Sequence, residues 1–291
     1  MKKILLKTLL PLSAIALVGA GVTSSLVLTS CKNNSPEVTT YNLDGTDWWG
    51  RVSGSFINSN HWGWTINDKA KTVTYEFKGH GQIGNVNYVA NDLFIPTYVK
   101  GIETGNKPYK VVIGDRAFDK RVNPNIYIFG YVYISDGISD IKKSAFYKQN
   151  LSGVVLPSSL LTIGDDAFED CEKLCYVDMS SCKDIISIGE GAFASSVDLE
   201  TLALSKKIEA IDYFSFAGSS KICNFNIFFD YNDVVGNDNK GAFRDSYGNG
   251  SNGIINLFGS GWTADNKGAI GSWLFGTQWV GSSSWTINVI A

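Results

Sequence analysis

The sequence has few of the residues that usually carry enzyme chemistry. It contains only two histidines, His61 and His80, among 291 residues. Neither belongs to an H-E-x-x-H motif, no partner stands at metal-ligand spacing, and no serine lies in a G-x-S-x-G motif. These absences argue against a zinc hydrolase and a serine hydrolase. We therefore expect a protein that is not an enzyme and that holds no catalytic metal and no cofactor.

An excess of positive charge is missing as well. The formal net charge is −3 at pH 7. It falls to −6 if the first thirty residues are removed as a signal, because Lys2, Lys3 and Lys7 leave and no acid does. An acidic surface does not attract phosphate backbones, so nucleic acid is not an expected partner.

The first thirty residues are typical of a secretion signal, with a positive start and an apolar stretch from Leu9 to Val18. The small residues of "LTSC" before Cys31 resemble a bacterial lipobox, which implies that this cysteine receives diacylglycerol. An uncleaved membrane anchor over residues 8–30 is the alternative. We expect a signal peptide over 1–30, a lipidated Cys31 with a polar tether to residue 47, and an extracellular, membrane-anchored position on a mycoplasma-like bacterium.

One phrase recurs along the middle of the chain. In "LTIGDDAF" and its copies an isoleucine precedes a phenylalanine by five residues, and successive phenylalanines are 22 to 28 residues apart. The paired positions are Ile113 and Phe118, Ile141 and Phe146, Ile163 and Phe168, Ile188 and Phe193, and Ile211 and Phe216, with a degraded copy ending at Phe243. A repeat of this length is the signature of a solenoid.

The rest of each unit also repeats. A short run with alternate apolar residues precedes each isoleucine, as in "GVVLP" and "ETLALS". Such runs predict short strands with alternate side chains turned inward. We therefore expect a β-rich solenoid of leucine-rich repeats, with one short strand and one helical or 3₁₀ turn per coil and β-hairpin caps at both ends. The repeated isoleucines and phenylalanines should form its core.

The segment "LSGVVLPSSLLTIGDDAFEDCEKLCYVDM", residues 151–179, resembles the leucine-rich repeat of bacterial surface antigens of the BspA-like family. The segment 91–118 is similar to the entry unit of that family, so the resemblance covers about residues 90–243. It implies a right-handed solenoid that is displayed on a bacterial surface and used for adhesion. It does not specify a ligand.

The segments beside the repeats have a different composition. Alternation in 48–89 predicts an N-terminal β cap containing a hairpin turned at Asn67 to Lys71. Residues 244–291 are rich in Gly, Ser and Trp and predict a C-terminal cap. The alternative is that aromatic residues at the two ends stack on sugar rings. The candidate ligand-contacting residues are Trp48, Trp49, Trp62, Trp64, Trp262, Trp273, Trp279 and Trp285.

Two further features have competing interpretations. Cys171, Cys175, Cys182 and Cys223 could form two disulfides in an exported chain, but buried free thiols are favoured, and Cys171 with Cys182 is the one bridge to look for. The acidic segment 230–241 could hold a cation but lacks the ligand spacing of an EF-hand, which favours a solvated insertion.

These patterns together predict a surface lipoprotein that binds an extracellular host or environmental protein or glycan. A substrate-capture lipoprotein that assists a transporter or enzyme is one alternative. A passive surface antigen is another. An exposed aromatic patch on the strand face would favour adhesion, whereas a deep pocket would favour capture.

Overall fold

The computed structural model describes residues 51–52, 55–56, 62–67, 69–77, 88–90, 93–95, 110–122, 124, 126–134, 136–184, 187–208, 210–234, 241–244, 253–275 and 285–290. All of them belong to one compact unit, Trp48–Ala291.

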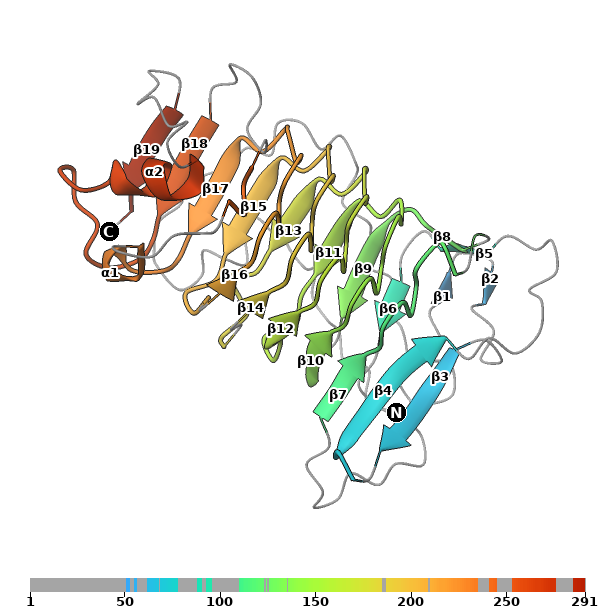
Figure 1. The fold of residues 1–291 in the computed structure, drawn as a ribbon. Helices are drawn as coiled ribbons and strands as arrows, with labels where there is room; N and C mark the ends of the chain where they lie inside the picture. The colour runs from blue at the N-terminus through green and yellow to red at the C-terminus, as the bar shows by residue number, and fades with distance from the viewer. Residues whose placement is uncertain are drawn as a thin grey trace, which may run out of the picture. The chain divides into compact units, whose positions relative to one another are not determined.

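Among these residues the larger sheet has eight strands, all paired in parallel (Figure 1). In sheet order they are β6 (Leu93–Ile95), β9 (Tyr131–Ile134), β11 (Gly153–Val155), β13 (Tyr176–Asp178), β15 (Thr201–Leu204), β17 (Asn224–Ile227), β18 (Gly253–Leu257) and β19 (Trp285–Val289). Parallel neighbours need a long connection between them, and here that connection is one coil of the solenoid.

The second sheet has seven strands within the described ranges. In order they are β3 (Trp62–Asn67), β4 (Thr72–Phe77), β7 (Lys110–Ile113), β10 (Ile138–Ile141), β12 (Thr162–Ile163), β14 (Ser187–Ile188) and β16 (Ala210–Ile211). Strands β3 and β4 are antiparallel and form the expected hairpin, and β4 then pairs in parallel with β7. The hairpin therefore extends this sheet beyond the first coil.

The remaining elements are short. Strands β1 (Arg51–Val52) and β2 (Ser55–Phe56) are antiparallel, and β5 (Tyr88–Ala90) pairs in parallel with β8 (Ile126–Ile128). The helices are α1 (Tyr231–Val234) and α2 (Ala269–Phe275).

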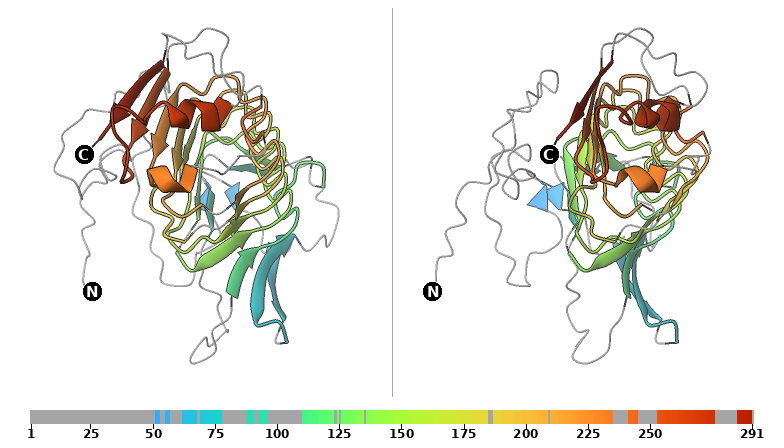
Figure 2. Two further views of the ribbon diagram at one scale, coloured as in Figure 1. Left: turned by 60° about the vertical axis from the view of Figure 1, so that its left-hand side comes forward. Right: turned by 90° about the vertical axis from the view of Figure 1, so that its left-hand side faces the viewer.

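Each of the four coils from β9 to β16 contributes a strand to both sheets, one strand more than the sequence predicted. Strand β9 is followed by β10, β11 by β12, β13 by β14 and β15 by β16, and the repeated isoleucine lies in the second strand, as Ile163 does in β12. Three of these second strands are only two residues long, too short for alternation to reveal them. Viewed along the stack in Figure 2, the coils wrap around a shared interior.

The segment around each repeated phenylalanine is a run of hydrogen-bonded turns rather than a helix. Around Phe168, Asp166 has a φ of 54° and Asp170 a φ of 57°, and most coils place left-handed residues at the same two positions. Left-handed residues at such short intervals prevent a continuous helix. The amide of Phe168 donates to the Ala192 carbonyl at 2.7 Å, which ties one coil to the next.

The repeated phenylalanines form one continuous stack through the core. Neighbouring ring centroids are 4.9 to 5.1 Å apart with interplanar angles of 2° to 8°. The stacked residues are Phe118, Phe146, Phe168, Phe193, Phe216 and Phe243, all buried. The repeated isoleucines are buried as well, so the predicted core is confirmed.

The C-terminal part differs from the expected hairpin. Strands β18 and β19 pair in parallel and continue the larger sheet. The connection between them includes α2, since parallel neighbours cannot be joined by a tight turn. The prediction of a β-hairpin at this end was therefore wrong.

Candidate binding surface

The outer face of the larger sheet carries a group of aromatic residues. On β9, β11 and β13 the outward positions form two rows of three, because Tyr131 and Tyr176 both align with Gly153, and Tyr133 and Asp178 both align with Val155. We call this surface the tyrosine face; it consists of Tyr131, Tyr133, Gly153, Val155, Tyr176 and Asp178.

The side chains of the tyrosine face are close together. The ring centroids of Tyr131 and Tyr133 are 6.0 Å apart, and the Tyr131 ring covers Gly153. Tyr131, Tyr133 and Tyr176 are each partly exposed. The absence of a side chain at Gly153 therefore lets two tyrosines from alternate strands share one surface.

Asp178 is held in place at the edge of this surface. Its Oδ2 accepts a hydrogen bond from the Tyr176 hydroxyl at 2.9 Å, and its Oδ1 accepts one from the Ser180 amide at 2.8 Å. Burial and the Asp178 carboxylate raise the pKa of Tyr176 above its ordinary value. Tyr176 therefore remains protonated and keeps the carboxylate fixed.

A second aromatic pair lies just before β9 in the chain. Tyr127 and Phe129 stack with centroids 5.9 Å apart, and the Lys120 Nζ lies 4.3 Å from the Tyr127 ring centroid. Phe129 is 44% exposed.

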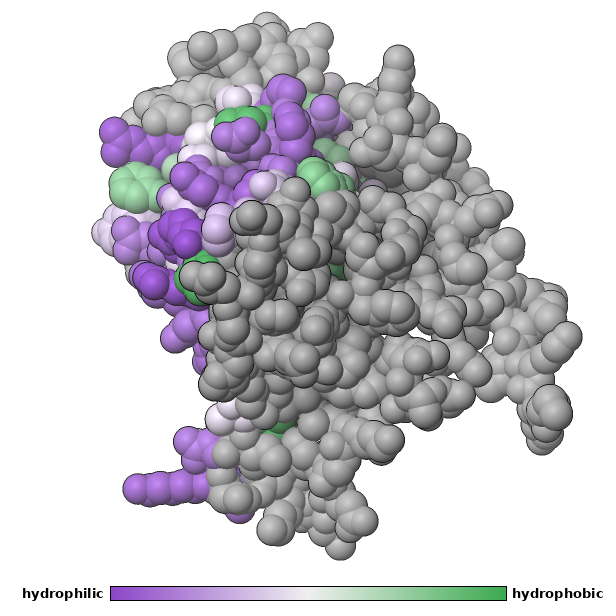
Figure 3. Space-filling view, turned by 90° about the vertical axis from the view of Figure 1, so that its right-hand side faces the viewer, coloured by the Kyte–Doolittle hydropathy of each residue, from purple (hydrophilic) through white to green (hydrophobic). Residues whose placement is uncertain are grey.

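On the part of the surface visible in Figure 3, hydrophilic residues predominate among those described, and the hydrophobic ones are scattered.

The C-terminal strands of the same sheet carry a row of asparagines. Asn256 donates through Nδ2 to the Oδ1 of Asn226, and Asn288 donates in the same way to Asn256, both at 3.0 Å. These amides join β17, β18 and β19 side by side, and Asn226 and Asn256 are buried. We assign the row to sheet stability, because its polar groups bond to one another.

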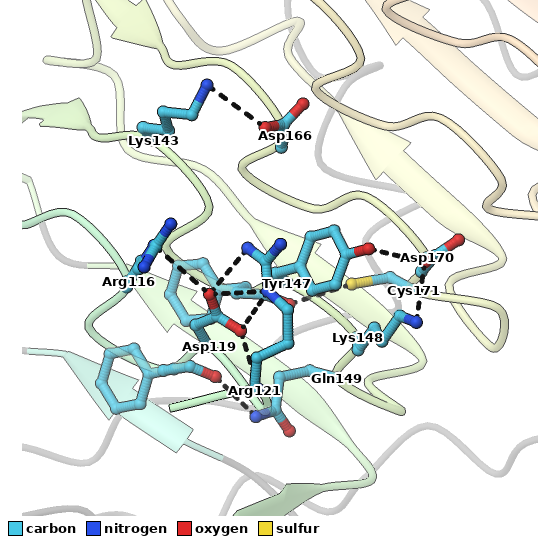
Figure 4. A network of polar contacts seen from close by, with 12 residues as sticks. Arg116, Asp119, Arg121, Lys143, Tyr147, Lys148, Gln149, Asp166, Asp170 and Cys171 are labelled. Carbon is cyan, nitrogen blue, oxygen red and sulfur yellow. Dashed lines mark hydrogen bonds and ion pairs between the residues drawn. The ribbon is translucent and has the colours of Figure 1, made fainter. Parts of the chain in front are cut away.

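The turns on the side of the phenylalanine stack carry a network of charges (Figure 4). The buried Asp119 receives bonds from the Arg121 guanidinium at 2.8 to 3.1 Å, and this guanidinium lies 3.5 Å from the centroid of the Tyr147 ring. The Tyr147 hydroxyl in turn donates to Asp170 in the following coil, at 3.0 Å. The network joins three coils, so it has a structural explanation.

A second set of bonds runs along the third position after each phenylalanine. There the side chain donates to the carbonyl of the phenylalanine one coil earlier: Gln149 to Phe118 at 2.6 Å, Cys171 to Phe146 at 3.3 Å, Ser196 to Phe168 at 3.5 Å and Ser219 to Phe193 at 3.2 Å. The position therefore requires a small or flexible hydrogen-bond donor.

No disulfide joins the four cysteines of the described part, Cys171, Cys175, Cys182 and Cys223. Cys171 and Cys182 are buried, as favoured, whereas Cys175 and Cys223 are only partly buried. The bridge between Cys171 and Cys182 is not formed, because each Sγ points to the carbonyl of a different residue in the preceding coil.

Asp140 on β10 is a second buried carboxylate. Burial opposes its ionisation, but hydrogen bonds from Lys110, Ser139 and Thr162 outweigh burial and lower its pKa. These partners lie on β7, β10 and β12, so the carboxylate holds three neighbouring strands together.

Three of the candidate tryptophans have described side chains. Trp262 is 6% exposed and donates from its indole nitrogen to the Phe229 carbonyl at 3.1 Å. Trp273 and Trp285 are partly buried against the core. Trp62 and Trp64 lie on β3, but their side chains are outside the described part, as are Trp48, Trp49 and Trp279 entirely.

The start of the acidic segment is explained by local contacts. Asp230 accepts a hydrogen bond from the Ser260 amide at 2.6 Å, and Asp233 accepts one from the Asp230 amide at 2.9 Å. Residues 235–240 lie outside the described part. Within that part no cluster of three acidic, histidine or cysteine residues is arranged to hold a metal ion.

The structure does not describe Cys31 or the predicted signal peptide. Of the helices in the described ranges, neither has the length and apolar character needed to cross a bilayer.

Residues 139–246 match the family described as BspA type leucine rich repeat region, in six copies. The repeats are similar to BspA-type leucine-rich repeats. The match covers a little over a third of the chain and supports the repeat architecture. No curated protein matches the chain.

Among solved structures the chain is similar to a T. pallidum leucine rich repeat protein, with 15% identity and a TM-score of 0.45 over 69% of this chain and 85% of that one. A leucine rich cell surface protein from Faecalibacterium prausnitzii has 19% identity and a TM-score of 0.47 over 72% of this chain and 56% of that one. A leucine-rich repeat protein from Bacteroides ovatus has 17% identity and a TM-score of 0.43 over 70% and 50%. The chain thus spans about half of each of the latter two.

Sequence reasoning missed the tyrosine face. Its tyrosines and Asp178 stand in "YVYI" and "CYVDM", at the outward positions of strands whose alternate residues are buried. Reading the alternate positions as one aligned surface would have placed Tyr131, Tyr133 and Tyr176 together.

Proposed function

We propose that this protein is a non-enzymatic binding protein of a bacterial surface that contacts an extracellular protein or glycan through the tyrosine face. The observation that carries the proposal is the alignment, across β11, of two tyrosines on β9 with a tyrosine and a carboxylate on β13. Tyrosine gives a large contact area at a low cost in side-chain entropy, and aromatic residues are enriched in binding interfaces. The fixed strand spacing of about 4.8 Å keeps the surface ready for its ligand.

Binding by the full-length protein tests this proposal. An immobilised panel of extracellular matrix proteins and glycoproteins serves as the set of ligands. We expect binding to at least one of them, and the double substitution Tyr131→Ala with Tyr133→Ala should weaken it at least about tenfold. Tyr213→Ala is the matched control, because Tyr213 is 52% exposed and lies on the turn side of the coil. Equal binding by the double variant and the wild type would contradict the proposal.

The membrane attachment through Cys31 is a separate part of the proposal. Two acyl chains hold a protein stably, whereas one chain gives only marginal binding. Mass spectrometry of the mature protein should find an acylated Cys31 as its N-terminus. Cys31→Ser should leave the protein without lipid. An N-terminus at any other residue in the wild type would refute the anchor but would leave the tyrosine face untouched.

A further inference from the structure

One side of the last strand of the larger sheet pairs with no other described strand. Strand β19 ends the sheet order, and its neighbour in the described ranges is β18. The Ile290 amide donates to the Leu257 carbonyl of β18 at 2.9 Å. Because backbone groups alternate in direction along a strand, the N–H and C=O groups of Trp285, Ile287 and Val289 point away from β18. We call these backbone groups the β19 edge.

Lys267 covers part of the β19 edge. Its Nζ donates to the Ile287 carbonyl at 2.9 Å, and the lysine is partly buried. The turn before the lysine is held by Asn266. Its Oδ1 accepts a bond from the Thr263 amide at 2.7 Å, and its Nδ2 donates to the Gly261 carbonyl at 2.8 Å. A fixed turn therefore places an ammonium group on the backbone of the last strand.

The inward row of apolar side chains ends in an exposed residue. Val289 aligns with Leu257 of β18, and Leu257 is fully buried whereas Val289 is 38% exposed. Edge strands of natural proteins commonly carry charges or proline, which prevent pairing with another chain. The residues of β19, "WTINV", include neither. The charge that protects this edge is therefore that of Lys267, from a different part of the chain.

From these contacts we infer that the β19 edge is an association surface for a second copy of this chain, and that Lys267 limits access to it. The inference is independent of the tyrosine face. Two copies of β19 can pair antiparallel around a two-fold axis at Ile287. Each Ile287 amide then donates to the Ile287 carbonyl of the other copy, which is the carbonyl that Lys267 occupies.

The side chains of β19 are complementary to themselves in this register. Trp285 lies opposite Val289 of the second copy, and opposed aromatic and β-branched side chains stabilise antiparallel pairs. Thr286 lies opposite Asn288 of the second copy. Asn288 donates through Nδ2 to Asn256, and its Oδ1 can accept the Thr286 hydroxyl. No like charges meet across the axis, because β19 is uncharged.

A head-to-tail contact fits the structure less well. At the other end of the larger sheet, the inward residues Leu93 and Ile95 of β6 are 2% and 1% exposed. Strand β6 therefore offers no exposed apolar side chain to cover Val289. A head-to-tail contact would also repeat into a filament, whereas the two-fold pair closes with two copies.

Sedimentation velocity of the full-length protein in density-matched detergent tests the inference. Lys267→Ala should lower the dissociation constant of the dimer at least about tenfold, because each wild-type copy must give up a charge-assisted hydrogen bond before pairing. Lys267→Arg keeps a charged donor and should stay within about threefold of the wild type. Lys206→Ala is the matched control, since it removes the same charge from a side chain that is 67% exposed.

Two further measurements locate the contact. Val289→Pro in the Lys267→Ala background removes an amide that points away from β18, so it blocks pairing with a second copy and leaves the bonds to β18 intact. This double variant should be monomeric. In dimeric Lys267→Ala the Ile287 amide should exchange its hydrogen more slowly than in the wild type, because it donates to the second copy.

Several results would overturn the inference. One is a Lys267→Ala variant that associates no more tightly than the wild type, and another is a Lys206→Ala variant that dimerises as tightly as Lys267→Ala. A dimer that persists with Val289→Pro, or an Ile287 amide that exchanges equally fast in the dimer, would show that the copies meet elsewhere. None of these results bears on binding at the tyrosine face.

Discussion

Removing one ring from the phenylalanine stack should destabilise more than one coil. Phe168 is fully buried, with its ring centroid 5.0 Å from that of Phe146 and 5.1 Å from that of Phe193. Phe168→Ala removes two ring contacts, each contributing about 0.5 to 1.5 kcal/mol. Together with the loss of burial and the cavity that remains, the expected cost is about 3 to 5 kcal/mol.

Thermal unfolding and hydrogen exchange measure this effect. For a unit of this size each kcal/mol lowers the melting temperature by about 2 to 4 °C, so a decrease of about 10 °C is expected. Exchange should accelerate in the coils on both sides, because the stability of a solenoid depends on contacts between neighbouring repeats. Phe129→Ala is the control, since Phe129 is 44% exposed, and should cost about 1 kcal/mol or less. A melting temperature within about two degrees of wild type would refute the role of the stack.

Two more predictions concern the turns. Burial, followed by the carboxylates of Asp166 and Asp170, raises the pKa of Glu169 from 4.5 to about 7. The folded state thus binds this proton more tightly than the unfolded state, and stability should fall as the pH rises from about 4.5 to about 7. Glu169→Gln should remove that fall, by about 1 kcal/mol because the side chain is partly exposed. Gly191 has a φ of 63°, and a Cβ there would be 3.0 Å from an Asp166 oxygen. Gly191→Ala should therefore cost about 1 to 2 kcal/mol in urea unfolding.

Each of these predictions has a clear contrary result. A wild-type stability that is constant between pH 4.5 and 7, or a Glu169→Gln variant with an unchanged pH profile, would show that the charge of Glu169 is not unfavourable in the fold. Gly268→Ala serves as the control for Gly191→Ala, because Gly268 lacks a positive φ and its site is open. Equal stability of the two alanine variants would show that the left-handed position at Gly191 is not strained by a side chain.

The repeat and its core could be predicted from the sequence because they depend on a few apolar residues at nearly constant spacing. The positions of Ile163 and Phe168 recur at nearly constant spacing along the chain. Side chains at a position that recurs in this way pack against the equivalent side chains of the neighbouring coils. The second strand of each coil could not be predicted, because pairs such as Thr162–Ile163 become a strand only when stacking aligns them with the neighbouring coil. Backbone hydrogen bonds to the neighbouring coils, and not the strand propensity of the two residues, define these strands.

The tyrosine face was not recognised in the sequence for a related reason. Tyr131 and Tyr176 are 45 residues apart in the chain, and their common neighbour is a glycine, which carries no chemical signal of its own. Only the register of three strands shows that Gly153 lies between them. At the C-terminal end, the Gly-rich and Trp-rich composition suggested a hairpin, whereas packing of Trp285 against Phe225 and Phe275 accompanies a parallel strand.

Hydroxyl-radical footprinting of the full-length protein, with and without a bound ligand from the panel, tests the proposed binding surface most directly. Mass spectrometry reads the oxidation of each aromatic side chain separately. We expect the ligand to protect Tyr131 and Tyr133 from oxidation and to leave the exposed Tyr213 on the turn side unprotected. Protection of Tyr213 with unchanged oxidation of Tyr131 and Tyr133 would show that the ligand binds elsewhere and would refute binding at the tyrosine face.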